Sequence, residues 1–157
     1  MSVEVLLNQV EMDYALLCAA ARIEKSKGYS LDTEHIPPEL RLRAFALGAT
    51  AELAAAKWLK VPNFKLTIDT YKSEPDIAPD WEVKHTVQDN GHLIIQQNDR
   101  DSDRAVLVTG LNPFTIRGWL PVSYCKDSLY LKTTSRNTAY WVPQTELVKV
   151  YEPVPQT

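Results

Sequence analysis

The strongest constraint on the fold is a change of pattern at Pro62. Before it the chain is dominated by helical spacing, and after it come short runs rich in β-branched and aromatic residues. Helices followed by strands predict mixed layering around one sheet. The 157 residues can build one domain with a sizeable core but not two ordinary domains. We therefore predict a single α/β domain over residues 1–152, with a mixed central sheet flanked by helices, and a disordered tail over 153–157.

Two helices are predicted in the first part, residues 3–60. An apolar stripe starts at Val3, and Gly28 ends this run. Pro37-Pro38 marks the start of a second helix that continues to Leu59, because proline is tolerated in a first helical turn. The stripe has the three- and four-residue spacing of one buried helical face: Leu6, Leu7, Val10, Tyr14 and Leu17. We expect a homodimer, because closed two-fold assembly is common. The stripe could form its interface, but packing on the core of its own chain is the favoured interpretation.

The second part, residues 63–150, is predicted to form the sheet. Its strand-like runs are Phe64–Ile68, Trp81–Lys84, Leu93–Ile95, Ala105–Val108, Phe114–Ile116 and Ala139–Val142. The run from Ala105 to Val108 is apolar throughout, which predicts a central strand that is buried on both faces.

Composition excludes several classes of protein. The sequence has no apolar run of membrane-spanning length and no secretory leader pattern, so we expect a cytoplasmic protein. Cys18 and Cys125 are too few for a disulfide framework, and Cys18 is expected to be buried among apolar neighbours. The net charge of −3 argues against a protein that coats nucleic acid, so any phosphate binding should be local and assisted by metal.

The stretch from Glu74 to Lys84 carries the candidate chemistry. Glu82 and Lys84 are two residues apart on a predicted strand, so both side chains project from one face. Asp76 precedes them across a proline-containing bend that can return its carboxylate towards Glu82. Asp80 shares the strand face of Glu82 and competes for the role of Asp76. Two carboxylates beside an ammonium group suit Mg²⁺-assisted hydrolysis of a phosphodiester, although such a pattern also arises on solvated strand edges.

A fourth candidate, Glu52, lies on the second helix. Gly48 precedes it by one turn, and a glycine there would let the helix approach the sheet closely, so that Glu52 points at the site. The ordinary alternative is a surface glutamate on an alanine-rich helix.

Together Glu52, Pro75-Asp76 and Glu82-Val83-Lys84 resemble the PD-(D/E)XK, or restriction-endonuclease-like, nuclease superfamily. The resemblance runs from about Gly48 to Leu147. Within it, the sequence after Lys84 is similar to small phage-encoded members of the superfamily. The similar later segments are Leu93–Ile95, Asp99 with Asp101, Val106–Gly110, Pro113-Phe114, Gly118-Trp119 and Val142-Pro143.

The resemblance implies roles for these residues. Asp76 and Glu82 would bind Mg²⁺ or Mn²⁺, with help from the backbone carbonyl of Val83. Lys84 would serve the attacking water, and Glu52 would bind metal directly or through water. The family places its first acid after proline, which favours Asp76 over Asp80. DNA would be cut to leave 5′-phosphate and 3′-hydroxyl ends.

We therefore expect a metal-dependent deoxyribonuclease, an endonuclease of phage DNA processing or recombination. The alternative is a catalytically inactive protein of this fold that acts in nucleic-acid binding or assembly, which the acidic pI supports.

Other chemistry-bearing residues have ordinary interpretations. His35, His85 and His92 lack ligand spacing, and Asp99, Asp101 and Asp103 are typical of a solvated turn. Trp119 and Trp141 are expected in the core. Plausible phosphate contacts are Arg100, Arg104, Arg117, Lys126, Lys132 and Arg136.

Overall fold

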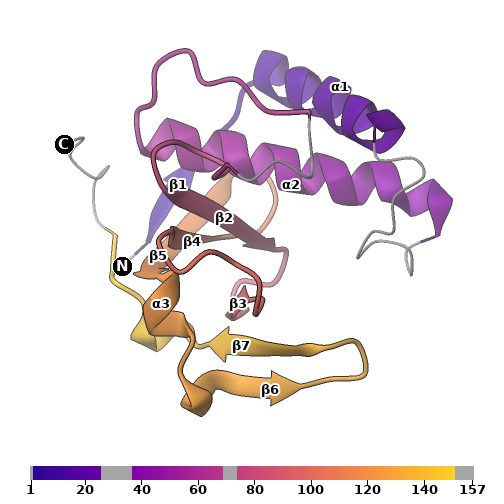
Figure 1. The fold of residues 1–157 in the computed structure, drawn as a ribbon. Coiled ribbons are helices and arrows are strands. Elements are labelled where there is room, and N and C mark those ends of the chain that lie inside the picture. The colour runs from indigo at the N-terminus through magenta and orange to yellow at the C-terminus, as the bar shows by residue number, and fades with distance from the viewer. Residues whose placement is uncertain (1, 26–36, 69–73, 151–157) are drawn as a thin grey trace.

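The computed structural model describes residues 2–25, 37–68 and 74–150 (Figure 1). Gly28, His35 and the predicted tail 153–157 lie outside these residues. The main elements are β1 (Val3–Val5), α1 (Gln9–Lys25), α2 (Pro38–Trp58), β2 (Trp81–Thr86), β3 (Leu93–Ile95), β4 (Arg104–Thr109), β5 (Phe114–Pro121), α3 (Val122–Cys125), β6 (Leu131–Thr133) and β7 (Thr138–Val142). Two 3₁₀ helices, Ser128–Tyr130 and Gln144–Glu146, complete the described chain. The predicted α/β class is confirmed.

The first sheet has the strand order β1-β5-β4-β2 and is mixed, as predicted. β2 runs parallel to β4, whereas β4 pairs antiparallel with β5, and β5 with β1. β4 has neighbours on both sides, and its residues from Ala105 to Thr109 are all buried. The apolar run from Ala105 to Val108 is therefore a central strand, as its composition predicts. β2, which carries Glu82 and Lys84, lies at an edge.

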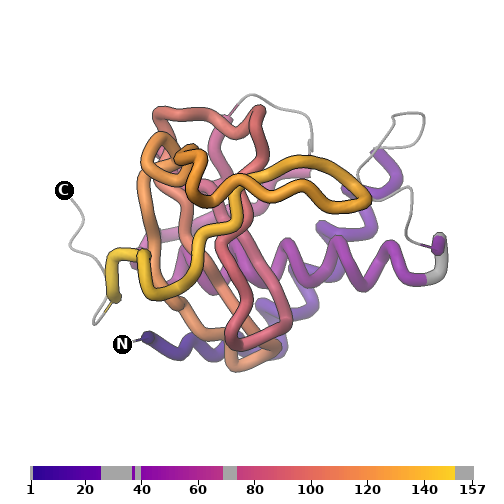
Figure 2. Tube along the Cα trace, turned by 90° about the horizontal axis from the view of Figure 1, so that it is seen from below, coloured from indigo at the N-terminus to yellow at the C-terminus, as the bar shows by residue number. Residues whose placement is uncertain are grey.

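A second sheet, β3-β7-β6, corrects the expectation of one central sheet. Its strands are antiparallel, and β6 and β7 form a hairpin that projects from the body of the molecule (Figures 1 and 2). The two sheets separate because Leu93, Ile95 and Val142 pack with Ala105 and Leu107 in a second buried cluster between them. Burial of that apolar surface favours two packed sheets over one extended sheet.

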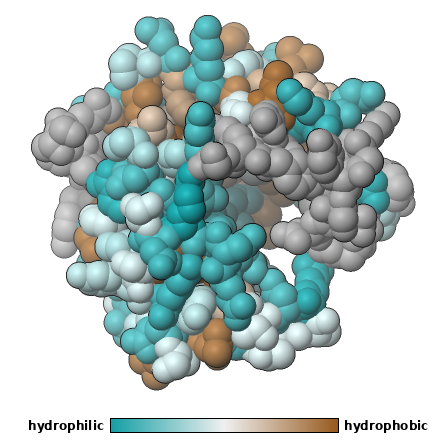
Figure 3. Space-filling view, viewed as in Figure 1, coloured by the Kyte–Doolittle hydropathy of each residue, from teal (hydrophilic) through white to brown (hydrophobic). Residues whose placement is uncertain are grey.

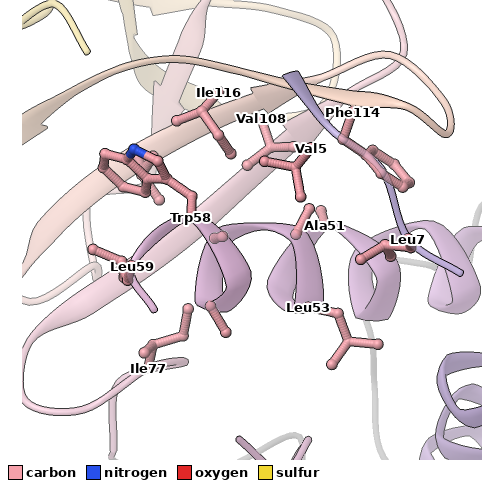
Figure 4. Close-up of a cluster of buried hydrophobic side chains, with 14 of the residues drawn as sticks. Val5, Leu7, Ala51, Leu53, Trp58, Leu59, Ile77, Val108, Phe114 and Ile116 are labelled. Atoms are coloured by element: carbon pink, nitrogen blue, oxygen red, sulfur yellow. The ribbon is translucent and has the colours of Figure 1, made fainter. Parts of the chain in front are cut away.

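Helix α2 covers the other face of the first sheet, where the larger core lies, and α1 packs on the side of α2 away from the sheet (Figures 1 and 4). Ala51 and Trp58 of α2 are buried with Val108, Phe114 and Ile116 of the sheet. Small side chains of α2 are buried and let the neighbouring elements approach the helix closely, with Ala51 and Ala55 on the same face as Trp58: Ala49, Ala51, Ala54, Ala55 and Ala56.

Gly48 does not mark this approach. A Cβ built there would meet nothing within 4 Å apart from its own helix and chain neighbours. The prediction that glycine lets the helix lie close to the sheet is therefore wrong, because the alanines on the buried face of α2 make that contact.

The start of the first helix also differs from the prediction. Val3–Val5 forms β1, and α1 begins only at Gln9. Asn8 and Glu11 exchange hydrogen bonds, since the backbone N of each donates to the side chain of the other at 2.8 Å. This reciprocal cap satisfies two amides that have no partner inside the helix, and so fixes where α1 starts.

The late start changes which face of α1 is buried. Ala15, Cys18 and Ala19 face the interior, which confirms the burial of Cys18. Three stripe residues lie outside instead, with exposed fractions of 64% for Leu6, 77% for Val10 and 71% for Leu17. Packing on the chain's own core is therefore wrong for these three, and a homodimer through them stays a prediction.

The predicted strand Phe64–Ile68 is irregular. Leu66 is buried, but its backbone N donates to the Tyr14 hydroxyl at 2.9 Å rather than to a strand. The side-chain hydroxyl replaces the sheet ladder as hydrogen-bond partner, so the alternating pattern does not produce a strand here.

Candidate active site

The edge strand β2 presents Glu82 and Lys84 on one face. Val83 packs against the core under α2, so alternation turns its two neighbours to the opposite face. Their partners in the parallel register are Ala105 for Glu82 and Leu107 for Lys84, both members of the second buried cluster. The shared face follows from the two-residue spacing, and it looks towards the second sheet rather than towards α2.

A bend returns Asp76 to the edge of β2. Ile77 and Trp81 close it with an antiparallel bridge, in which each backbone N donates to the other residue's carbonyl. Asp76 Oδ2 then accepts a hydrogen bond from the backbone N of Val83 at 2.8 Å. The Asp76 carboxyl also lies within hydrogen-bonding reach of the Glu82 side chain, and such a bond requires a proton on one of the two acids. The two acids are thus in direct contact, as the proline-containing bend suggests.

Proximity and burial change the acidity of this pair. Burial raises the pKa of Asp76 above its ordinary value, although the hydrogen bond from Val83 and the charge of Lys84 oppose the rise. Burial also raises the pKa of Glu82, to about 8, with a further contribution from the charge of Asp76. Two neighbouring carboxylates that are partly shielded from water resist simultaneous ionisation. The pair therefore favours a proton or a cation between its oxygens.

Asp80 lies apart from this pair. It precedes β2, and its carboxylate makes an ion pair with Arg104 at 2.7 Å. The Arg104 guanidinium also lies 4.0 Å from the centroid of the Trp81 ring. The expectation that Asp80 shares the face of Glu82 is therefore wrong, because Asp80 turns to the nearest cation. Of the two candidate acids, Asp76 is the one that contacts Glu82.

Glu52 is buried, with an exposed fraction of 8%, so it is not a surface glutamate. Its carboxylate accepts two hydrogen bonds from the guanidinium of Arg22 on α1, Nη1 to Oε2 at 3.0 Å and Nη2 to Oε1 at 3.1 Å. Arg22 Nε also donates to the backbone O of Thr67 at 2.7 Å. The pKa of Asp76 is raised overall, and the charge of Arg22 is one of the smaller effects that oppose the rise. This ion pair therefore lies near the candidate site.

Lys84 has a partner that the sequence interpretation missed. Its Nζ lies 2.9 Å from Oδ2 of Asp99, which also accepts a hydrogen bond from the backbone N of Gln96 at 2.8 Å. Lys126 Nζ donates to the backbone O of Asp99 at 2.7 Å, which helps to hold the loop between β3 and β4 in place. The reading of Asp99 and Asp103 as a solvated turn is wrong, because Asp99 reaches Lys84 and Asp103 is buried.

The other residues weighed from the sequence lie elsewhere. His85 Nε2 is 2.8 Å from the backbone O of Gly110, and burial lowers the His85 pKa. Trp119 packs against the larger core, as predicted. Arg104 pairs with Asp80, and Lys126 pairs with Asp101. These ion pairs give the two cations structural roles in place of the predicted phosphate contacts.

The donor atoms of the site are of the kind that binds a magnesium ion. Asp76 and Glu82 supply hard carboxylate oxygens, and the carbonyl of Val83 lies between Glu82 and Lys84 in sequence. Within the ranges that the structure describes, no group of three or more His, Cys, Asp or Glu side chains is placed to hold a metal ion. Mg²⁺ is commonly held by only one or two carboxylates, with waters and substrate phosphates as the remaining ligands. The contacting pair fits that arrangement.

Comparison of the chain with protein-family models, with curated proteins and with solved structures found no match. The PD-(D/E)XK assignment therefore stays a prediction from the motif and its geometry. No helix among the described residues is both long and apolar enough to cross a membrane.

Proposed function

We propose that this chain is a metal-dependent deoxyribonuclease of the PD-(D/E)XK type. The observation that carries the proposal is the contact between Asp76, at the bend before β2, and Glu82, which shares one face of the edge strand β2 with Lys84. These three residues converge although a bend separates the first from the others. An assembly module of the same fold would have no use for two contacting, half-buried acids whose pKa values are both raised.

The roles follow from the positions of the side chains. The carboxylates of Asp76 and Glu82 and the carbonyl of Val83 would hold Mg²⁺ or Mn²⁺. The bound ion would supply positive charge that polarises the phosphate and makes a nearby water more acidic. Lys84 Nζ orients that water and stabilises the negative charge that develops as the water oxygen attacks phosphorus. The bond from phosphorus to the 3′ oxygen breaks. The attacking water gives up one proton to the surrounding water, and the 3′ oxygen takes one from it as it leaves.

Glu52 takes a different role in this proposal from the one that the resemblance implies. Its carboxylate is held in a bidentate pair by Arg22, so we assign it to positioning. Arg22 connects α1, α2 and the backbone of Thr67, which leads into the segment before Asp76. Together Arg22 and Glu52 would fix the side of the site from which Asp76 approaches.

The direct test is cleavage of end-labelled single-stranded, duplex and branched DNA in Mn²⁺, in Mg²⁺ and in EDTA. We expect metal-dependent products with 5′-phosphate ends, which a phosphatase converts to hydroxyls and a ligase accepts before that treatment. Absence of cleavage of all three substrates in both metals would instead favour the alternative, a catalytically inactive binding protein.

Asp99 provides a separate prediction about how Lys84 is held. Asp99→Asn should lower kcat by about ten- to a hundredfold with little change in KM, because partners behind a reacting group typically contribute that much. Asp99→Glu should restore part of the loss, since it keeps the charge. Asp101→Asn is the matched control, because Asp101 is an exposed acid in the same loop that pairs with Lys126. Equal kcat in the Asp99→Asn variant and the parent would remove Asp99 from the site.

A further inference from the structure

The β6–β7 hairpin differs in charge from the rest of the chain. The segment from Ser128 to Thr145 contains no aspartate or glutamate, but it contains Lys132 and Arg136, in a chain with a net charge of −3. Arg136 lies exposed at the turn between the two strands. Figures 1 and 2 both show the hairpin extending from the body of the molecule. This local excess of positive charge is complementary to a polyanion.

The outer face of the second sheet is aromatic and cationic. Ile94 and Trp141 are register partners on β3 and β7. Their neighbours Leu93, Ile95 and Val142 point into the second core cluster, so Ile94 and Trp141 point away from it. Lys132 Nζ lies 4.1 Å from the centroid of the Trp141 ring. Trp141 is thus only partly buried, and the expectation of a core tryptophan is wrong.

A hollow of about 620 Å³ opens on this face. Ile94 and Trp141 form its apolar wall, and the turn residues 134–137 with Gln96 supply hydroxyl, guanidinium and amide groups. Asn137 Nδ2 donates to Gln96 Oε1 at 2.6 Å and ties the turn to the loop after β3. Among the residues that the structure describes, no carboxylate lines the hollow. The face of the molecule seen in Figure 3 is mostly hydrophilic, with scattered hydrophobic residues.

The hollow is connected to the candidate active site. The backbone N of Gln96 donates to Asp99 Oδ2, and the same oxygen pairs with Lys84 Nζ at 2.9 Å. One residue therefore contributes its side chain to the hollow and its backbone to the support of Lys84. The hollow lies on the outer face of the second sheet, and the chain Gln96–Asp99–Lys84 is its link to the candidate active site.

We propose that this hollow binds an unpaired nucleotide of single-stranded DNA, with its base against Trp141 and Ile94 and its phosphate near Arg136. An aromatic wall and a cationic rim are the two features by which proteins hold single strands without reading sequence. A base within a duplex is stacked on both sides and cannot enter such a hollow without leaving the stack. The identity of the ligand as DNA rests on the proposed nuclease function, and the hollow then makes the single strand the preferred substrate.

The test measures binding separately from cleavage. Fluorescence anisotropy of a labelled single-stranded oligonucleotide in EDTA reports affinity when no metal is present. Arg136→Gln and Trp141→Leu should each weaken binding by about tenfold, since one stacked base or phosphate contact contributes on that order. Arg136→Gln should also reduce the dependence of affinity on salt. Lys149→Gln, at an exposed lysine outside the hairpin, is the matched control and should bind like the parent.

The outcomes separate this proposal from the nuclease proposal. Unchanged affinity of the Arg136→Gln variant, which alters an exposed turn residue and should fold, would overturn single-strand binding at the hollow even if the parent cleaves DNA in Mn²⁺. Tighter binding of a matched duplex than of the single strand would overturn it as well. Loss of affinity in both hairpin variants supports the proposal, and absence of cleavage by a parent that binds in this way would overturn only the nuclease.

Discussion

Glu82→Gln and Lys84→Ala should each reduce DNA cleavage by about a hundred- to ten-thousandfold while the fold is retained. The lysine contributes proton handling and charge at the attacked phosphate, and such groups typically contribute that range. Glu82→Gln removes one of two carboxylate ligands and the charge that repels Asp76. Single-turnover cleavage in saturating Mn²⁺ measures the effect on the chemical step without the contribution of product release.

The controls for these variants come from the same part of the chain. Asp80→Asn also neutralises an acid two residues from Glu82, but one that pairs with Arg104 outside the site, so cleavage should stay within a few-fold of the parent. Circular dichroism and thermal melting check that each variant folds. Parent-like cleavage by folded Glu82→Gln or Lys84→Ala would show that the reaction, if present, takes place elsewhere.

The second large effect concerns metal and stability together. Mg²⁺ or Mn²⁺ should stabilise the folded chain, by about 2.7 kcal/mol at a hundredfold excess over its dissociation constant. For a domain of this size that corresponds to a rise in Tm of about 5–10 °C. Asp76→Asn should remove most of the rise, because it removes one of the two contacting carboxylates, whereas Asp80→Asn should retain it. Thermal melts of the three proteins with and without metal measure this.

The pH dependence of the same melts has a definite sign. The pKa of Glu82 is about 8 in the fold, against an ordinary value of 4.5 for an unfolded chain, so between these values the folded chain holds a proton that the unfolded chain releases. The free energy of unfolding in EDTA should therefore fall as pH rises from about 4.5 to 8. Asp76→Asn should flatten this fall and stabilise the EDTA form near pH 8, since one repelling charge is gone. A Tm in EDTA that rises over this window, or a metal response transferred to the Asp80 variant, would contradict the arrangement.

Local patterns predict part of this structure well. The second helix follows from its helix-forming residues, and β4 follows from its continuous apolar run. The shared face of Glu82 and Lys84 follows from the two-residue period of a strand. Each of these features depends on residues that are close in sequence, so a short window contains the information.

Local patterns do not predict the features that depend on partners far away in the sequence. Val3, Val5 and Leu7 alternate as in a strand, but the longer helical spacing through Val10 and Leu17 suggested that the helix starts earlier. The segment from Phe64 to Ile68 alternates without finding a strand to pair with. The ion pairs of Lys84 with Asp99 and of Glu52 with Arg22 join residues whose separation in sequence carries no periodic signal.

The ion pair of Arg22 with Glu52 determines how short a fragment of this chain can be and still fold. The motif lies between Gly48 and Leu147, yet Arg22 is supplied by α1, which precedes that region. A fragment trimmed to the motif-bearing segment would lose the cation that holds Glu52 and the backbone of Thr67. Breaking a buried ion pair of this kind typically costs about 3–5 kcal/mol, a large share of the stability of a small domain. The smallest fragment that folds by itself therefore has to include α1 as well as the motif-bearing segment.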